Sequence, residues 1–224
     1  MRFSPVATPE ELSSLIQEIG FLPFFRNHIP GFSIEEITPA DLWFSDELEG
    51  PWEWKGPVIT MTHCAYGKLF QNKAGYISEE WYPDFANYRR DGYDFEARYE
   101  DGLAKHKDKL VLDVLEETGP ILSKSLKQQA GFGKDGQKGF DGVITRLQMQ
   151  GYVICTNFEY MRDRHGIPYG WGVARYGTPE QFFGDSFADL AYQREPAGSY
   201  LCMLEHLKKL LPDVDEAAIR KLLG

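Results

Sequence analysis

The chain has 224 residues, of which 42% are hydrophobic and 26% charged, a composition typical of a soluble globular protein with a buried core. No apolar run approaches the roughly 18 residues of a membrane span, and the first residues lack the apolar stretch of a secretory signal. The three cysteines lie far apart without C-x-x-C spacing, which excludes a zinc ribbon and favours reduced thiols. We therefore expect a cytoplasmic protein with no metal site and no membrane partner.

The net charge of −10 is distributed unevenly along the chain. Residues 123–176 contain 8 Lys and Arg against 4 Asp and Glu, whereas the segments 1–122 and 177–224 are both acidic. An acidic surface repels the phosphates of nucleic acids, but a basic segment within an acidic chain indicates a local contact surface.

The segment 1–102 predicts a mixed α+β region. Thr8 can cap a helix that Gly20 ends, and Leu12, Ile16 and Ile19 form the apolar stripe of this helix. The residues that follow are rich in Pro, Gly and aromatic side chains and predict irregular structure with short helices near 35 and 41. The remaining predictions in this segment are a strand over 58–63, a hairpin from 65–70 and 75–78, and a helix over 78–90. A further helix, over 104–117, is predicted at the start of the next segment.

The segment 103–177 predicts a winged helix-turn-helix, in which two helices precede a β-hairpin. Ser123 as N-cap and Gly131 as C-cap predict one short helix between them. The second helix has apolar residues at positions 140, 143, 144 and 147, which share one helical face. Two β-rich runs, 152–158 and 169–176, complete the hairpin. We thus predict an α+β chain with this central winged-helix domain between an aromatic-rich N-terminal region and a C-terminal helical tail.

The tail, 178–224, predicts a short helix after Thr178, an amphipathic helix over 199–211 and a final helix over 213–223. Its leucine stripe packs on the body of the protein in the favoured interpretation. The alternative is a homodimer seam formed by Leu201, Leu204, Leu207, Leu210 and Leu211.

The second helix of the winged domain carries the side chains expected to contact double-stranded DNA. With its apolar residues inward, the opposite face presents Asp141, Thr145, Arg146 and Gln148, and the last three can donate to base edges or phosphates. Winged helices also serve as packing modules, so DNA contact and a purely structural role both stay open. The predicted phosphate contacts are Lys124, Lys127, Lys138, Arg162 and Arg164.

An aromatic segment, 43–82, predicts a second candidate site. It contains four of the five tryptophans, and such rings could stack a flat ligand or a base. Large aromatic side chains more often fill a core, which is the favoured interpretation. The candidate pocket residues are Trp43, Trp52, Trp54, His63, Tyr66, Lys68 and Trp81.

Two further patterns have simpler interpretations. The run Gly131–Gly136 fits G-x-G-x-x-G, but a helix precedes it where a dinucleotide fold needs a strand, so no cofactor is predicted. Arg89 and Arg90 at the end of a predicted helix could bind an anion. We favour the alternative that they stabilise the carboxyl end of that helix through its dipole.

The run from Gly67 to Pro83, with the two arginines and the winged motif of 119–176, resembles the bacterial winged-helix DNA glycosylases of the AlkZ/YcaQ type. It is closer still to small proteins described as related to them. In the glycosylases a Gln-Φ-Gln or Gln-Φ-Asp motif near the N-terminus positions the attacking water. Here the only such triplet is Gln148-Met149-Gln150, far from the N-terminus, and Gly75 stands where the family has a histidine. The resemblance therefore implies a DNA-related role without glycosylase chemistry.

The leading hypothesis is a non-catalytic relative of these glycosylases that binds DNA weakly or recognises a modified or distorted duplex. Whether the protein is an enzyme stays open, with the motif evidence against glycosylase activity. One alternative is an enzyme or small-molecule-binding protein with its pocket in 43–82. The other is a structural protein that dimerises through the C-terminal leucines.

Overall fold

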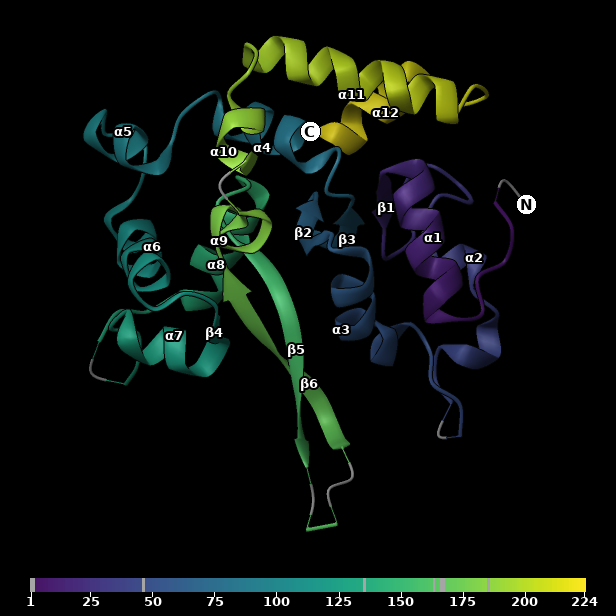
Figure 1. The fold of residues 1–224 in the computed structure, drawn as a ribbon, viewed down its shortest axis with the longest axis horizontal. Helices are drawn as coiled ribbons and strands as arrows, with labels where there is room; N and C mark the ends of the chain where they lie inside the picture. Colours follow the sequence, from purple (N-terminus) through teal and green to yellow (C-terminus); the bar gives the residue numbers. More distant parts are fainter. Residues whose placement is uncertain (1–2, 46, 135, 163, 166–167, 185) are drawn as a thin grey trace.

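A computed structural model gives the fold, and it describes residues 3–45, 47–134, 136–162, 164–165, 168–184 and 186–224, without the side chains of 161–162 and 168–171. The chain has the predicted α+β class. Within the described residues, six strands form one antiparallel sheet in the order β1-β3-β2-β5-β6-β4. Helices surround this sheet, and the two long strands β5 and β6 extend away from the body of the protein (Figure 1).

The first helix confirms the predicted caps. Helix α1 (Pro9–Ile19) begins after Thr8, whose hydroxyl accepts a hydrogen bond from the Glu11 backbone N at 3.2 Å, and it ends at Gly20 with φ of 79°. The Glu11 carboxylate accepts from the Ala7 backbone N at 2.7 Å, one residue before the position expected in a capping box. Three short elements follow: β1 (Phe21–Pro23), α2 (Ile34–Ile37) and the 3₁₀ turn η1 (Ala40–Leu42).

The predicted strand over 58–63 is wrong, because these residues form the second half of helix α3 (Pro51–Thr62). Pro51 stands at the first helical position, and the Glu53 carboxylate accepts from the Gly50 backbone N at 2.9 Å. Helix α3 packs against α1, and the Thr62 hydroxyl donates to the Ser13 hydroxyl at 2.7 Å. The β-branched residues of this run favour a strand locally, but packing of the helix overrides that preference.

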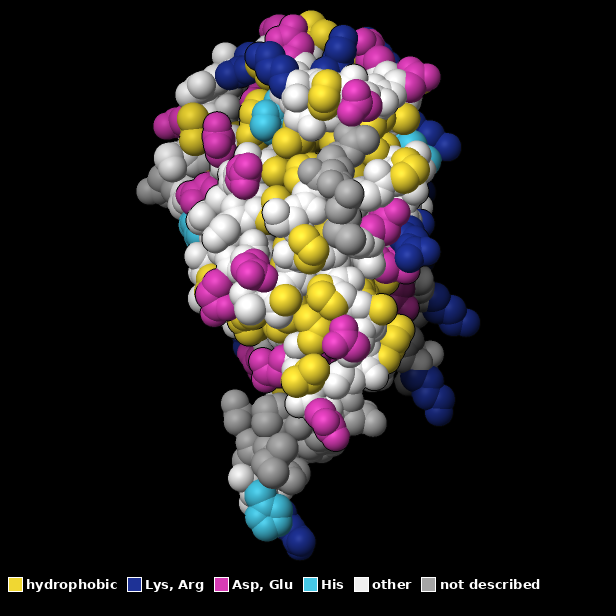
Figure 2. All heavy atoms as spheres, turned by 90° about the vertical axis from the view of Figure 1, so that its right-hand side faces the viewer, with side chains coloured by type: hydrophobic (Ala, Val, Ile, Leu, Met, Phe, Trp, Pro, Cys, Tyr) yellow, Lys and Arg dark blue, Asp and Glu magenta, His cyan; other side chains and the backbone are white. Residues whose placement is uncertain are grey.

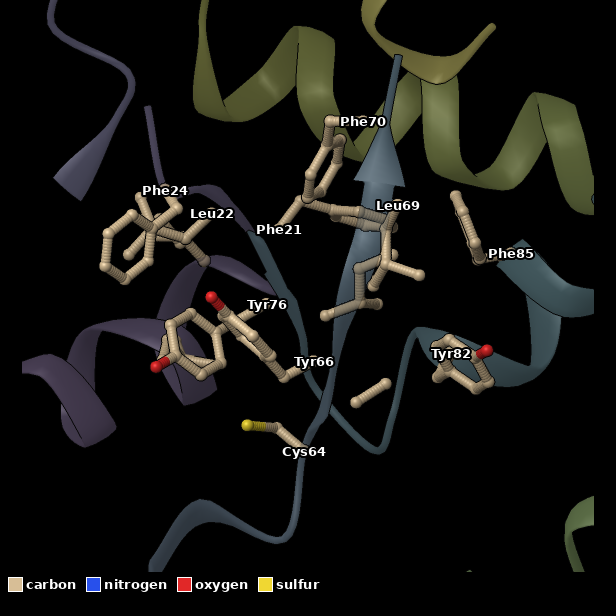
Figure 3. Packing of buried hydrophobic residues seen from close by; sticks show 14 of the residues in the cluster. Phe21, Leu22, Phe24, Cys64, Tyr66, Leu69, Phe70, Tyr76, Tyr82 and Phe85 are labelled. Atoms are coloured by element: carbon tan, nitrogen blue, oxygen red, sulfur yellow. The ribbon is translucent and has the colours of Figure 1, made fainter. Parts of the chain in front are cut away.

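The first hairpin is confirmed, with a tighter turn than expected. Strands β2 (Ala65–Phe70) and β3 (Lys73–Ile77) are joined by Gln71 and Asn72, which have φ of 51° and 65°. Two consecutive residues with positive φ are typical of the two-residue turns that fit the twist of a hairpin. The rings of Tyr66 and Tyr76 lie 4.7 Å apart beside Cys64 (Figure 3).

The predicted helices and second hairpin of the winged segment are present in the expected order. Helices α4 (Tyr82–Arg90) and α5 (Phe95–Glu100) precede it. Strand β4 pairs with β6, and β6 pairs with β5. Both predicted caps of the short helix are wrong by one residue, because Leu122 is the N-cap and Ala130 the C-cap. The elements are α6 (His106–Thr118), β4 (Ile121–Leu122), α7 (Ser123–Gln129), α8 (Phe140–Met149), β5 (Ile154–Arg162) and β6 (Pro168–Gly177).

Within the described ranges, the buried apolar residues form two clusters. The smaller cluster lies between α6, α7 and α8 and contains all four apolar residues predicted for α8, namely Phe140, Val143, Ile144 and Leu147. The larger cluster joins the N-terminal elements to the C-terminal helices. The chain ends therefore contribute to one core, while the segment around α8 has its own.

The C-terminal helices cover the larger cluster. Leu204, Leu207 and Leu211 are buried in it, whereas Leu201 is exposed, so most of the leucine stripe is used within the chain. The Ser199 hydroxyl on α11 donates to the Asp84 carboxylate on α4 at 2.6 Å. No helix among the described residues is long and apolar enough to cross a membrane. The helices are α9 (Pro179–Phe183), α10 (Ser186–Ala191), α11 (Pro196–Leu210) and α12 (Glu216–Leu223).

Candidate nucleic-acid interface

Helix α8, the predicted reading helix, is covered on two sides. Its apolar face lies in the smaller cluster, and strand β2 packs against a second face. Gln148 is 3% exposed, its Oε1 accepts from the Lys68 backbone N at 2.8 Å, and its Nε2 donates to the Ile144 carbonyl at 3.3 Å. A Cβ on Gly67 would lie 2.7 Å from this Oε1, so the glycine makes room for the amide. The expectation that Gln148 faces outward is wrong, because the helical pattern shows one apolar face and not the polar contact with β2.

Arg146 is engaged in an internal ion pair. Its Nε donates to Asp108 Oδ2 at 2.9 Å and its Nη2 donates to Oδ1 of the same carboxylate, which is 1% exposed. The hydrogen bond to Asp108 raises the pKa of Arg146. This pair ties α8 to α6 and neutralises the charge that was expected to face DNA.

Thr145 is partly buried and lies beside a lysine that the sequence assigned to another site. The Lys68 Nζ on β2 donates to the Thr145 hydroxyl at 3.1 Å. Lys68 is exposed, so its ammonium group stays at the surface beside α8. The structure therefore brings a predicted DNA contact and a predicted pocket residue together.

The remaining predicted phosphate contacts are exposed. Lys124 and Lys127 lie on α7 and Lys138 lies in the turn before α8, and within the described part of the chain their side chains form no ion pair. Arg164, beyond the end of β5, is also exposed and its Nε donates to His165 Nε2 at 2.9 Å. The side chain of Arg162 lies outside the described residues.

The side of the molecule formed by the N-terminal helices carries side chains of both charges (Figure 2). Figure 2 shows the face formed by the N-terminal helices, where acidic side chains are dispersed among hydrophobic ones. Lys and Arg on this face gather at its upper end and along one edge. The exposed lysines of α7 and of the turn before α8 lie in 123–176, which is the one of the three sequence segments in which Lys and Arg outnumber Asp and Glu.

A surface groove of about 580 Å³ runs beside α8. Its walls come from α8, from the turn between β2 and β3, and from the end of α4. The sequence did not predict this groove, because its walls are distant in the chain. Its lining residues are Asn72, Arg89, Asp141, Gly142, Thr145, Arg146, Met149 and Gln150.

The aromatic residues of 43–82 do not surround one pocket. Trp54 and Tyr66 are buried in the larger cluster, and Trp81 stacks on His206 at 4.1 Å. His63 is exposed, with its Nδ1 and Nε2 each 3.0 Å from acceptors, the Glu79 carboxylate and the Phe182 carbonyl. Trp43, Trp52 and Tyr66 instead share ring contacts with Phe24, which the sequence did not assign to this site.

Trp43 and Trp52 do line a cavity of about 370 Å³. Their partners there all come from outside the predicted set. One of them is Phe44, next to Trp43, and Phe44 is 87% exposed. The aromatic run Phe24-Phe25 is the sequence signal that could have indicated the opposite wall. The other lining residues are Phe25, Arg26, Glu35 and Ala40.

Lys55 is a buried amine that the sequence did not single out. It is 7% exposed, and its Nζ lies 4.5 Å from the ring centre of Phe158 and 5.0 Å from that of Trp52. Burial lowers the pKa of this lysine, although Cys155 and Glu53 act in the opposite direction. The cation–π contacts link α3 to β5 at the base of the hairpin.

A family model described as AlkZ related matches residues 6–224, which is nearly the whole chain. The chain belongs to the AlkZ-related family. Comparisons with curated proteins and with solved structures yielded no match.

The two positions that depart from the glycosylase pattern have structural roles in this AlkZ-related chain. The amide of Gln148, the first glutamine of the Gln-Met-Gln triplet, is engaged with β2, and Gln150 lies at the end of α8 in the groove wall. Gly75 lies in β3, where a Cβ would approach the Phe70 ring to 2.5 Å and the Leu22 carbonyl to 2.8 Å. A histidine would not fit at this position without displacing the Phe70 ring.

Proposed function

We propose that the segment His106–Gly177 is a winged helix and that this AlkZ-related protein uses it to bind duplex DNA non-catalytically, through the sugar-phosphate backbone. The order of α6, β4, α7, α8, β5 and β6 supports the winged-helix assignment. The observation that carries the binding proposal is the exposure of Lys124, Lys127 and Lys138 without ion pairs among the described residues. Their charges are available to replace counterions on DNA phosphates.

The contacts of α8 favour backbone binding over reading of bases. Arg146 and Gln148 would be the main donors to base edges, and both are held by internal hydrogen bonds. We therefore expect little dependence on sequence, and recognition of a modified or distorted duplex would arise from the shape of the DNA. The same contacts make α8 the helix that joins the winged segment to β2.

The experiment is a fluorescence anisotropy titration of a labelled duplex at low salt. We expect binding that weakens as salt rises, and the double variant Lys124→Gln/Lys127→Gln should lower the salt slope by about 2 because two phosphate contacts are lost. The matched control is Lys209→Gln/Lys221→Gln on α11 and α12, which removes two exposed charges elsewhere that likewise form no ion pair among the described residues. Absence of binding by the wild-type protein at low salt would reject the proposal.

A second candidate function is binding of a flat small molecule at the cavity beside Trp43 and Trp52. Trp43, Phe44 and Trp52 line this cavity, and their rings can stack a flat ligand. Quenching of tryptophan fluorescence by adenosine or guanosine, reduced in Phe44→Ala, would support this function. Unchanged fluorescence with both nucleosides would argue against a nucleoside as the ligand.

A further inference from the structure

Arg89 lies in the wall of the α8 groove without an ion pair among the described residues, and its guanidinium packs against Gly224, where a Cβ would lie 2.5 Å from Nη1 and 2.6 Å from Nη2. Its Nε and Nη2 are buried and have no hydrogen-bond partner in the described part of the chain. The guanidinium instead lies 5.2 Å from the ring centre of Phe85 and 6.0 Å from that of Tyr88. Burial lowers the pKa of Arg89, and Tyr88 acts in the opposite direction.

The neighbouring Arg90 shows what a structural arginine looks like in this fold. It is fully buried, and its guanidinium donates to the Gly151 carbonyl at 2.8 Å, to Glu180 at 2.6 Å and to the Tyr192 hydroxyl at 2.9 Å. Arg90 thus stabilises the fold. Nε and Nη2 of Arg89, in contrast, form no hydrogen bond among the described residues, and this lowers the stability of the folded state. Such a cost is typical of residues that are kept for binding.

The charges around the groove favour an anion at the Arg89 end. Lys68 reaches its edge through the hydrogen bond to Thr145, and Arg146 is neutralised by Asp108. Asp141, at the amino end of α8, also lines the groove and opposes an anion there, so the anion is favoured where the groove wall comes from Arg89.

We propose that the groove beside α8 is a phosphate-binding site in which Arg89 is the principal donor, assisted by Lys68 and by the amides of Asn72 and Gln150. Nη1 is the terminal nitrogen of Arg89 that is not buried, so it is the one that can contact a phosphate in the groove, and the amides that line the same groove add neutral donors. If the proposed function holds, on which this part of the inference rests, the bound group is a backbone phosphate of the duplex next to α8.

The test first uses inorganic phosphate as the probe. The melting temperature of the full chain is measured in phosphate and in chloride at equal ionic strength, because a ligand of the folded state raises this temperature. We expect phosphate to stabilise the wild-type protein, with the effect lost in Arg89→Gln, partly kept in Arg89→Lys and unchanged in the control Lys209→Gln. The melting temperature of Arg89→Gln without phosphate should not fall, since the side chain has unmade hydrogen bonds.

The second arm measures the salt dependence of duplex binding by the same variants. A loss of about 1 in the salt slope for Arg89→Gln identifies the anion as a DNA phosphate. Arg89-dependent phosphate stabilisation without any duplex binding would keep the site, assign it to a free phosphate ester and reject the proposed function. Equal phosphate stabilisation of wild type and Arg89→Gln, or none in either, would overturn the site itself.

Discussion

Arg146 and Asp108 form a two-point ion pair that joins α8 to α6 across the smaller hydrophobic cluster. The carboxylate is buried, while part of the guanidinium reaches the surface. The pair therefore stabilises the same helix that would lie closest to DNA. Loss of DNA binding in an Arg146 variant would consequently reflect damage to the fold as well as any lost contact.

We expect Arg146→Met to lower the free energy of unfolding by about 3 kcal/mol, because it leaves a buried carboxylate without its partner. The double variant Arg146→Met/Asp108→Leu should recover most of this loss, since a well-packed apolar pair avoids the cost of removing charges from water. Urea denaturation followed by circular dichroism measures both changes. A double variant no more stable than the single one would show that the uncompensated carboxylate is not the cause.

A second prediction concerns the contact between Gly67 and Gln148. In Gly67→Ala the new methyl group would displace the Gln148 amide and break its hydrogen bond to the Lys68 backbone, at a cost of about 1 kcal/mol. Because the cost arises from one clash, Gly67→Ala should have little further effect in a Gln148→Ala background. Full additivity in a double-mutant cycle would disprove the coupling.

The buried amine of Lys55 should make stability depend on alkaline pH. Its pKa is lowered in the folded state, so the unfolded chain binds the proton more tightly, and the free energy of unfolding should rise with pH up to the ordinary value of 10.5. Lys55→Met should remove this rise and increase stability at neutral pH by about 1 kcal/mol, because no charge is then buried. Urea titrations at several pH values measure the slope, and an identical slope in the variant would contradict the assignment.

The cysteines should differ in reactivity. Burial raises the pKa of Cys64 and of Cys155 to about 12, so neither forms the nucleophilic thiolate readily. Cys202 is only partly buried on α11. A thiol reagent should modify Cys202 rapidly and the other two only after unfolding. Three equally fast reactions would show that the cores around β2 and β5 open readily.

Local signals were sufficient for much of the fold. Thr8 and Gly20 mark α1 because caps act within a few residues, and the apolar period of α8 places Leu147 and its companions in a core. The run 58–63 shows the limit of this reasoning. Its β-branched residues carry a local preference, and only the packing of α3 against α1 decides the outcome.

The candidate site was less accessible from sequence. The exposed lysines of α7 were predicted from a charge pattern that tertiary structure leaves unchanged. Arg146 and Gln148 depend on partners 38 and 80 residues away, and no period along α8 reveals them. Arg89 was visible as a charge at the end of a helix, but its unmade hydrogen bonds and the groove around it arise only when α4, α8 and the turn at Asn72 meet.

The pairing of Tyr66 with Cys155 makes one sheet out of the N-terminal hairpin and the long β5–β6 ribbon. A fragment cut at 103–177 would therefore lose the neighbour of β5 and expose a bare strand edge, which invites aggregation. The ribbon would also lose the cation–π contact between Lys55 on α3 and Phe158 on β5. Studies of nucleic-acid binding consequently need residues 1–102 as well as the winged segment, because strand β2 pairs with β5 and so holds the projecting ribbon in the sheet.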